Sequence, residues 1–490
     1  GLCCERGRGV PLNKEEAAKW YRKAAEQGEE DGMCCLGFLY EIGEGVEQSW
    51  SEAVKWYRKA AELGLSRAQC NLAWCYEHGQ GVEKDQTEAL SWYRKAAEQE
   101  DPRGLFCMAR AYDYGLGVQQ DAKEAVRWYE RAAQAGSAPA MCDLGVCYER
   151  GEGVEQDIDQ AAELYRKAAE LGNAPGQCNL GFCYETGRGV EQSWEEAVKW
   201  YRAAAEQEMP RAQCNLAWCY EHGRGVEKNE KRALAWYQKA ADQGDPRGMY
   251  CVGRAYDYGR GTEQNREQAV QWYQKAAEAG SVPAMCDLGV CYERGEGVEQ
   301  DLKKAVELYH RAAEQGDATG QCNLGHMYES GRGVGKDWTQ AARWYGAAAE
   351  QGLARAQLNL GVCCEFGRGV KKDPVRAAKL YRSAADQGDK TAQCNLGYLY
   401  ETGEGVEQNW QEAVKWYTQS ADQGYPRAQY HLAWCYEHAA GVKRDLDKAL
   451  ALYEAAAAQQ FEDAEKQVER LKKAPAKGKF LRGLFGRHDG

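Results

Sequence analysis

The chain has 490 residues and a formal net charge of −12, with 44% hydrophobic and 28% charged residues. The negative charge gives no reason to expect a nucleic acid or an anionic membrane as the partner of the whole molecule, and the apolar fraction argues against general disorder. No segment reaches the roughly 18 consecutive apolar residues that a transmembrane helix needs.

A Gly-x-Gly signature sets the organisation of the whole chain. It begins at Gly7 and returns every 36 residues, and its thirteenth place holds Ala439. Because a fixed period without insertions indicates one stacked supersecondary unit, we expect a repeat array rather than separate globular domains. The chain enters this period partway through a repeat, so we interpret Gly1 as the start of a fragment whose true N-terminus lies upstream.

The segment before each glycine pair is predicted to be a helix, which we name helix A. In the repeat that contains Gly79, residues Ala68, Leu72, Ala73 and Tyr76 recur at the spacing of one helix face. The residue six positions before the glycine is Gly or Ala in all the later repeats, and only a small residue fits where two helices approach closely. We therefore expect a second helix to pack tightly on helix A.

That second helix, helix B, is predicted to begin six residues after the first glycine. The position holds Asn, Ser or Asp in all thirteen repeats, for example Asp85, and these residues cap helix N-termini. A Glu or Gln follows three residues later in nine repeats, as Glu88 does, which predicts a capping box that also satisfies the N-cap backbone N–H. Recurring Ala and Tyr residues, such as Ala89 and Tyr93, predict the buried face. Ten of the first twelve B helices are followed by a glycine such as Gly28, which favours a left-handed C-cap.

The combined pattern, A-x-x-x-L-G-x-x-Y-E-x-G-x-G-V-x-x-D-x-x-x-A-x-x-W-Y-x-K-A-A-E-x-G, resembles the Sel-1-like repeat, a relative of the tetratricopeptide repeat with a longer turn between its helices. The resemblance extends from Gly7 to about Ala457. It implies an all-α fold, a right-handed α-α superhelix (solenoid) of 36-residue helix-turn-helix repeats. On this interpretation residues 1–460 form an array of about twelve to thirteen repeats, the first one truncated.

The end of the chain departs from the pattern. Residues 461–474 keep the helix A spacing but place Glu469 where a small residue belongs and Lys472 where Tyr belongs, so we predict a polar capping helix. Residues 475–490 are Gly-rich and basic, and we expect a disordered tail. The alternative is a weak contact with a membrane surface or an acidic partner through the apolar residues of that tail, Phe480, Leu481, Leu484 and Phe485.

Twenty-one cysteines recur mainly on helix A, often five residues apart, as Cys70 and Cys75 do. That spacing directs the two sulfurs apart, and we expect reduced thiols that act as small core residues. Reduced thiols favour a cytoplasmic location. A targeting signal would be lost with the missing N-terminus.

Two patterns could carry chemistry. Cys75 and His78 lie on one helix face, with copies at 219 and 222 and at 435 and 438, but zinc would need two further ligands and a catalytic pair would lack an orienting third group. The glycine turns lack a Walker lysine and a preceding strand, which nucleotide loops require. We expect no metal, cofactor or catalytic site.

An acidic residue stands two positions before every turn glycine, as Glu41 does. The helix dipole opposes a carboxylate at a helix C-terminus, so we expect a compensating donor, most simply the backbone of the glycine turn. The alternative is an acidic stripe along the groove, which would suit basic ligands.

The candidate binding residues are those that the core does not dictate, at the positions five and twelve before the glycine. Trp and Arg recur there, and both are enriched in binding hot spots. The alternative is that they serve packing between helices and ordinary surface charge. The proposed groove consists of Arg67, Trp74, Arg103, Arg110, Arg211, Trp218, Arg247, Arg254, Arg427 and Trp434.

The resemblance implies a non-enzymatic scaffold or adaptor that binds a protein or peptide along the concave face of its A helices. One alternative is the cysteine-rich secreted branch of the family, associated with β-lactam binding or hydrolysis. That branch staples each repeat with cysteines at the end of helix B, where this chain has Ala97 and Ala169. Another alternative is a regulatory arm of a larger signalling protein.

Overall fold

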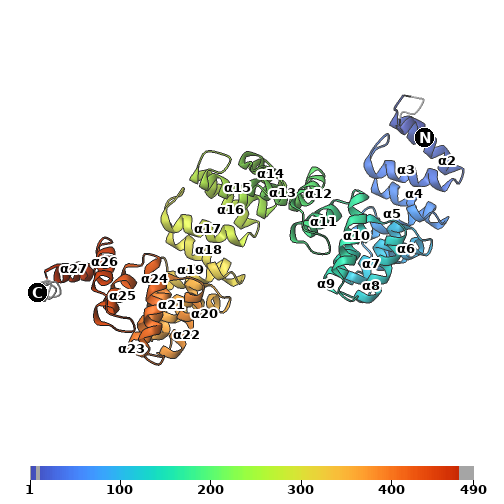
Figure 1. Cartoon of the computed structure of the whole chain (residues 1–490). Coiled ribbons are helices and arrows are strands. Elements are labelled where there is room, and N and C mark those ends of the chain that lie inside the picture. The colour runs from blue at the N-terminus through green and yellow to red at the C-terminus, as the bar shows by residue number, and fades with distance from the viewer. Residues whose placement is uncertain (1, 7–10, 474–490) are drawn as a thin grey trace, which may run out of the picture. The chain divides into compact units, whose positions relative to one another are not determined.

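The structure is a computed structural model that describes residues 2–6 and 11–473, and every regular element in that part of the chain is an α-helix (Figure 1). This confirms the predicted fold class. Odd-numbered helices correspond to helix A and even-numbered ones to helix B. The chain divides into two compact units, unit 1 up to Cys251 together with Arg260–Thr262, and unit 2 with Val252–Gly259 and everything from Glu263 onward.

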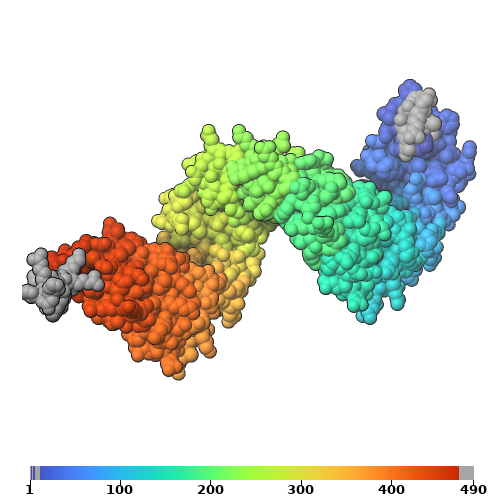
Figure 2. Space-filling view, in the orientation of Figure 1, coloured from blue at the N-terminus to red at the C-terminus, as the bar shows by residue number. Residues whose placement is uncertain are grey.

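Unit 1 contains fourteen complete helices in chain order. They are α1 (Leu2–Arg6), α2 (Lys14–Glu26), α3 (Glu30–Ile42), α4 (Trp50–Glu62), α5 (Ser66–His78), α6 (Gln86–Glu98), α7 (Pro102–Tyr114), α8 (Ala122–Gln134), α9 (Ala138–Arg150), α10 (Ile158–Glu170), α11 (Ala174–Thr186), α12 (Trp194–Glu206), α13 (Pro210–His222) and α14 (Glu230–Asp242). From α1 to α14, each helix packs against the next one along the chain, and consecutive repeats of the unit form a continuous surface in the face that Figure 2 shows.

The division between the units falls within α15 (Pro246–Tyr258). The complete helices of unit 2 are α16 (Arg266–Glu278), α17 (Val282–Arg294), α18 (Leu302–Glu314), α19 (Ala318–Ser330), α20 (Trp338–Glu350), α21 (Ala354–Phe366), α22 (Pro374–Asp386), α23 (Lys390–Thr402), α24 (Trp410–Asp422), α25 (Pro426–His438), α26 (Leu446–Ala457) and α27 (Glu462–Lys473).

The N-cap residues of helix B act as predicted in all thirteen repeats. Asp85, for example, accepts hydrogen bonds from the backbone N–H groups of Thr87 and Glu88 at 2.9 and 3.0 Å. The second half of the predicted capping box is wrong. The Asp85 N–H donates to the carbonyl oxygen of Tyr76 on helix A, at 3.0 Å, and this bond closes the turn between the two helices.

The two turn glycines have different roles. Gly79 has a φ of 70°, and the equivalent Ala439 adopts nearly the same left-handed conformation with a φ of 61°. Gly81 also has a positive φ, but a Cβ atom there would lie 2.4 Å from the carbonyl oxygen of Trp50, in helix B of the preceding repeat. The second glycine is therefore required for the contact between successive repeats.

The core consists of the predicted small and large residues. Tyr129 of helix B is fully buried, as are its counterparts in most repeats. A Cβ atom on Gly145 of helix A would lie 2.6 Å from Cε1 of Tyr165, so the expected tight packing on helix A is confirmed. This packing leaves the opposite face of helix A to carry the variable residues.

Helix α27 packs on α26 and buries Ala464 completely. Glu469 and Lys472, at the positions where a further repeat would need a small residue and a tyrosine, are both exposed. Lys472 pairs with Glu454, and the neighbouring Arg470 pairs with Glu437. The predicted capping role remains a prediction. Residue 474 and the basic tail at 475–490 lie outside the described residues. Among residues 2–6 and 11–473, no helix has both the length and the apolarity to cross a bilayer.

Candidate peptide-binding surface

The acidic residue before each turn is bonded to a tyrosine, and the expectation that the turn backbone would compensate it is wrong. Tyr57 Oη donates to Glu41 Oε2 at 2.5 Å, and Tyr129 Oη donates to Asp113 at 3.0 Å. The same pair forms in all thirteen repeats. Burial, followed by the hydrogen bond to Glu41, raises the pKa of Tyr57 above its usual value, so the hydroxyl remains a donor.

Some of these carboxylates carry a second partner from the next glycine turn. The partner is the arginine between the two glycines of that turn. The ion pairs are Arg188 with Glu149 at 2.9 Å, Arg260 with Glu221 at 2.9 Å, and Arg332 with Glu293 at 2.6 Å. In these repeats a tyrosine holds one carboxylate oxygen and a guanidinium holds the other.

Trp74, a predicted binding residue, lies within an aromatic stack. Its ring is 5.7 Å from that of Trp50 and 4.3 Å from that of His78, centroid to centroid, and it is still 39% exposed. His78 Nδ1 lies 3.0 Å from the Trp74 carbonyl oxygen, while Cys75 is fully buried. The histidine thus belongs to the stack and not to a site with the cysteine. The same stack recurs as Trp194, Trp218 and His222, and as Trp410, Trp434 and His438.

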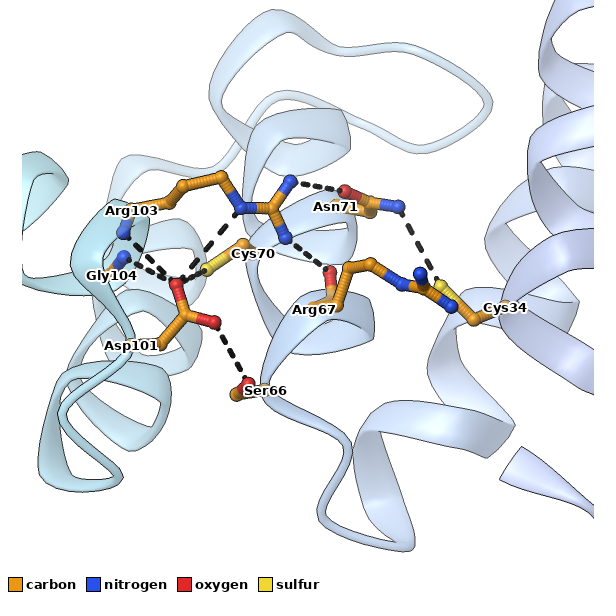
Figure 3. Close-up of polar contacts among 8 residues, drawn as sticks. All are labelled: Cys34, Ser66, Arg67, Cys70, Asn71, Asp101, Arg103 and Gly104. Atoms are coloured by element: carbon orange, nitrogen blue, oxygen red, sulfur yellow. Dashed lines mark hydrogen bonds and ion pairs between the residues drawn. The ribbon is translucent and has the colours of Figure 1, made fainter. Parts of the chain in front are cut away.

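The predicted arginines twelve positions before the glycine connect neighbouring A helices (Figure 3). Arg103 on α7 donates to Asn71 Oδ1 at 3.4 Å and to the Arg67 carbonyl oxygen at 3.2 Å, both on α5. Arg67 forms an ion pair with Asp31 on α3 at 3.1 Å. Both arginine side chains remain about half exposed, at 49% and 52%. The bonds from Arg211 to Asn179, Arg247 to Asn215 and Arg427 to Asn395 repeat the pattern.

Arg110 and Arg254 have different surroundings. Each is half-buried and lies over a tyrosine ring on its own helix, Arg110 over Tyr114 and Arg254 over Tyr258, at 5.9 and 5.8 Å. They occupy the position that holds Trp74 in another repeat, so this position varies between aromatic and basic residues as the sequence predicted.

Two larger cavities lie along the A helices of unit 1, and a small recess of about 20 Å³ in the same unit is lined by the predicted residue Arg110. The N-terminal cavity has a volume of about 520 Å³ and brings together three of the predicted residues, Arg67, Trp74 and Arg103. The second cavity, of about 370 Å³, contains Arg211. Trp218 and Arg247 also belong to unit 1 but line neither cavity, while Arg254, Arg427 and Trp434 belong to unit 2. The other residues that line the N-terminal cavity are Leu2, Glu5, Cys34, Cys35, Phe38, Glu41 and Asn71.

The repeat geometry agrees with a comparison to known families. The Sel1 repeat model matches thirteen consecutive segments of the chain, at residues 1–29, 31–65, 66–101, 103–137, 138–173, 174–209, 210–245, 246–281, 282–317, 318–353, 354–389, 390–425 and 426–461. The chain belongs to the Sel1 repeat family. A search among curated proteins gave no match.

The chain is similar to several proteins of solved structure. The c5321 protein, a protective antigen present in uropathogenic Escherichia coli strains that displays an SLR fold, is 36% identical over 86% of this chain and 90% of its own, with a TM-score of 0.67. A Sel1 repeat protein from Oxalobacter formigenes is 32% identical over 62% of this chain and 88% of its own, with a TM-score of 0.48. Cysteine rich protein B from Helicobacter pylori is 26% identical over 26% of this chain and 92% of its own, with a TM-score of 0.23.

The prediction from sequence missed the asparagines of the Sel1 array that hold the arginines. Asn71 and Asn179 line the two cavities and accept from Arg103 and Arg211. The signal was present in the sequence, since five asparagines are followed 32 residues later by an arginine, four residues short of the 36-residue repeat.

The described part of this Sel1 array contains no disulfide and no cluster of metal-ligating side chains. Most of its cysteines are buried, and none of those described forms a disulfide. No group of three or more His, Cys, Asp and Glu side chains within residues 2–6 and 11–473 is arranged to hold a metal ion.

Proposed function

We propose that this Sel1 array is a non-enzymatic scaffold that binds a protein or peptide along the surface of its A helices. The observation that carries the proposal is the N-terminal cavity, where Phe38 and Trp74 are 43% and 39% exposed beside charged residues. Large exposed aromatic side chains next to a recess are typical of protein-binding sites. The family and the fold support the same general function.

Two features support a binding role over the cysteine-rich enzymatic alternative. Ala97 and Ala169, at the positions where that branch has staples, are buried in the core. Burial raises the pKa of the Cys107 thiol to about 11, and a protonated buried thiol is a poor nucleophile. Reduced buried thiols also support our proposal of a cytoplasmic location. Titration of the denatured protein without reductant should detect about twenty-one free thiols, and a count near zero would favour the secreted branch.

The groove assignment is tested by capture of a partner on the immobilised array, with Trp74, Trp218 and Trp434 changed to Ala. We expect the triple variant to lose capture while its melting temperature stays close to that of the parent.

The matched control changes three tryptophans of B helices, Trp56, Trp92 and Trp272, to Ala. These rings lie under lysines and line neither cavity. Full capture by a folded A-helix variant, or an equal loss in the control, would remove the assignment.

A further inference from the structure

We infer that the N-terminal cavity binds an arginine side chain of a peptide partner, through the carboxylates of Glu5 and Glu41 and between the rings of Phe38 and Trp74. The inference rests on the proposed function, because it names the chemistry of the ligand that the A-helix surface takes. It goes beyond that function in assigning one cavity, one type of side chain and the residues that select it.

The carboxylates of Glu5 and Glu41 each have one oxygen bound by a tyrosine. Tyr21 donates to Glu5 Oε2 and Tyr57 donates to Glu41 Oε2, each at 2.5 Å, so each tyrosine holds one oxygen of its carboxylate. Among the side chains that the structure describes, neither Glu5 nor Glu41 has an ion-pair partner. Both residues line the cavity. Their second oxygens can therefore accept from a cationic ligand.

The second cavity of unit 1 is built from equivalent positions three repeats later. Glu149 corresponds to Glu41, and its Oε2 likewise accepts from a tyrosine, Tyr165, at 2.7 Å. Its Oε1 accepts from Nη1 of Arg188 at 2.9 Å, and Arg188 lines that cavity. The chain thus shows which group this carboxylate takes in this setting, a guanidinium.

The residue equivalent to Arg188 in the N-terminal cavity is Gln80, which carries no charge. In the preceding repeat the equivalent position holds Glu44, which pairs with Lys14. Neither of the two positions equivalent to Arg188 therefore holds an arginine. Charge complementarity points to an arginine from a partner.

The two arginines that line the cavity do not cancel this preference. Arg67 is paired with Asp31. Arg103 is bonded to Asn71 and to the backbone of Arg67, and it pairs with Asp101 at 4.0 Å (Figure 3). Phe38 and Trp74 supply apolar surface for the methylene stem of the incoming side chain, and Val146 and Phe182 hold the equivalent positions in the second cavity. Arginine suits the site better than lysine because its planar fork can donate to two acceptors at once.

The test uses a fluorescein-labelled nonapeptide with one central arginine among Gly and Ser residues, and the same peptide with citrulline, which has a similar shape but no charge. Fluorescence anisotropy with the whole protein at low ionic strength should give affinity at least about tenfold higher for the arginine peptide, since charge-assisted hydrogen bonds are roughly twice as strong as neutral ones. Glu41→Gln, which keeps the side-chain shape, should remove about tenfold of that affinity.

A reciprocal pair of variants exploits the equivalence of the two cavities. Gln80→Arg should supply the guanidinium from within the chain and suppress peptide binding, while Arg188→Gln should free Glu149 and add a second, weaker binding site. Thermal melting of each variant reports on its folding.

Equal binding of the citrulline peptide, or unchanged affinity in a folded Gln80→Arg variant, would overturn the arginine assignment. The same holds if neither peptide binds. The proposed function is judged separately, by capture of the whole partner with the tryptophan variants, so either idea can fail without the other.

Discussion

The two faces of helix A follow opposite rules. On α5 the face toward helix B buries Leu72 and Cys75 completely, and the corresponding tyrosine–carboxylate pair recurs in every repeat. On the other face the position of Trp74 holds phenylalanine, arginine or valine in other repeats. The repeated face determines stability and the varied face is free to determine binding. Substitutions on the two faces should separate these properties.

The largest expected effect is on the repeated face. Tyr129→Ala removes a fully buried ring and the donor to Asp113, and it should lower the free energy of unfolding by about 3–5 kcal/mol, as measured by urea titration. Trp74→Ala removes a partly exposed ring and its aromatic stacking, each stacked pair being worth about 0.5–1.5 kcal/mol, so its cost should be clearly smaller. A larger loss from Trp74→Ala would contradict the division into two faces.

The two glycines of one turn, Gly79 and Gly81, should differ in how much their substitution destabilises the fold. Gly81→Ala adds a Cβ against the Trp50 carbonyl oxygen and places alanine in the left-handed region, so it should cost about 3 kcal/mol from overpacking and backbone strain together. Gly79→Ala meets only Lys84, with Cβ at 3.3 Å and the backbone N and Cα at 3.6 and 3.7 Å, and should cost about 1–2 kcal/mol, mainly from backbone strain. Equal costs in urea unfolding would show that the contact between repeats has relaxed.

The local features of the fold were predictable from the sequence, and the long-range partners were not. Asp85 caps its own helix three residues later, so its role follows from neighbouring residues. The partner of Glu41 is Tyr57, sixteen residues away on another helix, and the partner of Arg103 is Asn71 in the preceding repeat. Turn chemistry alone could not identify these contacts, because they depend on how the helices pack. The aromatic and basic character of the candidate surface was predicted, whereas its cavities depend on that packing.

Several repeats depart from the arginine–asparagine pattern on the varied face, and the one that contains Asp143 gives a pH-dependent prediction. Asp143 takes the place of Asn179 and Asn71, and burial, followed by the nearby Asp113, raises its pKa to about 6. Arg110 opposes this shift. Because the folded state then binds this proton more tightly than the unfolded state, stability should fall as the pH rises from about 4 to about 6.

Asp143→Asn should abolish that decrease and raise the free energy of unfolding at pH 7 by on the order of 2 kcal/mol. Urea titrations at pH 4.5 and pH 7 measure both quantities. Asp159→Asn removes the same charge from an exposed position and serves as the control. A gain that is equal at both pH values would exclude the carboxyl group as its cause.

The smallest expected effect lies at the end of helix B, where most repeats have a left-handed glycine. Glu208 adopts a φ of 63° at this position, and Glu208→Gly should stabilise the fold by about 0.5–1 kcal/mol by relieving that strain. Glu100 has a similar left-handed conformation but forms an ion pair with Arg131 at 2.7 Å. Because both side chains are exposed to solvent, this ion pair contributes at most about 1 kcal/mol to stability. Glu100→Gly should therefore give a smaller rise in melting temperature than Glu208→Gly. Equal rises in melting temperature would mean that the ion pair contributes nothing. A lower melting temperature in both variants would mean that the two glutamate side chains stabilise the repeat and would contradict the strain argument.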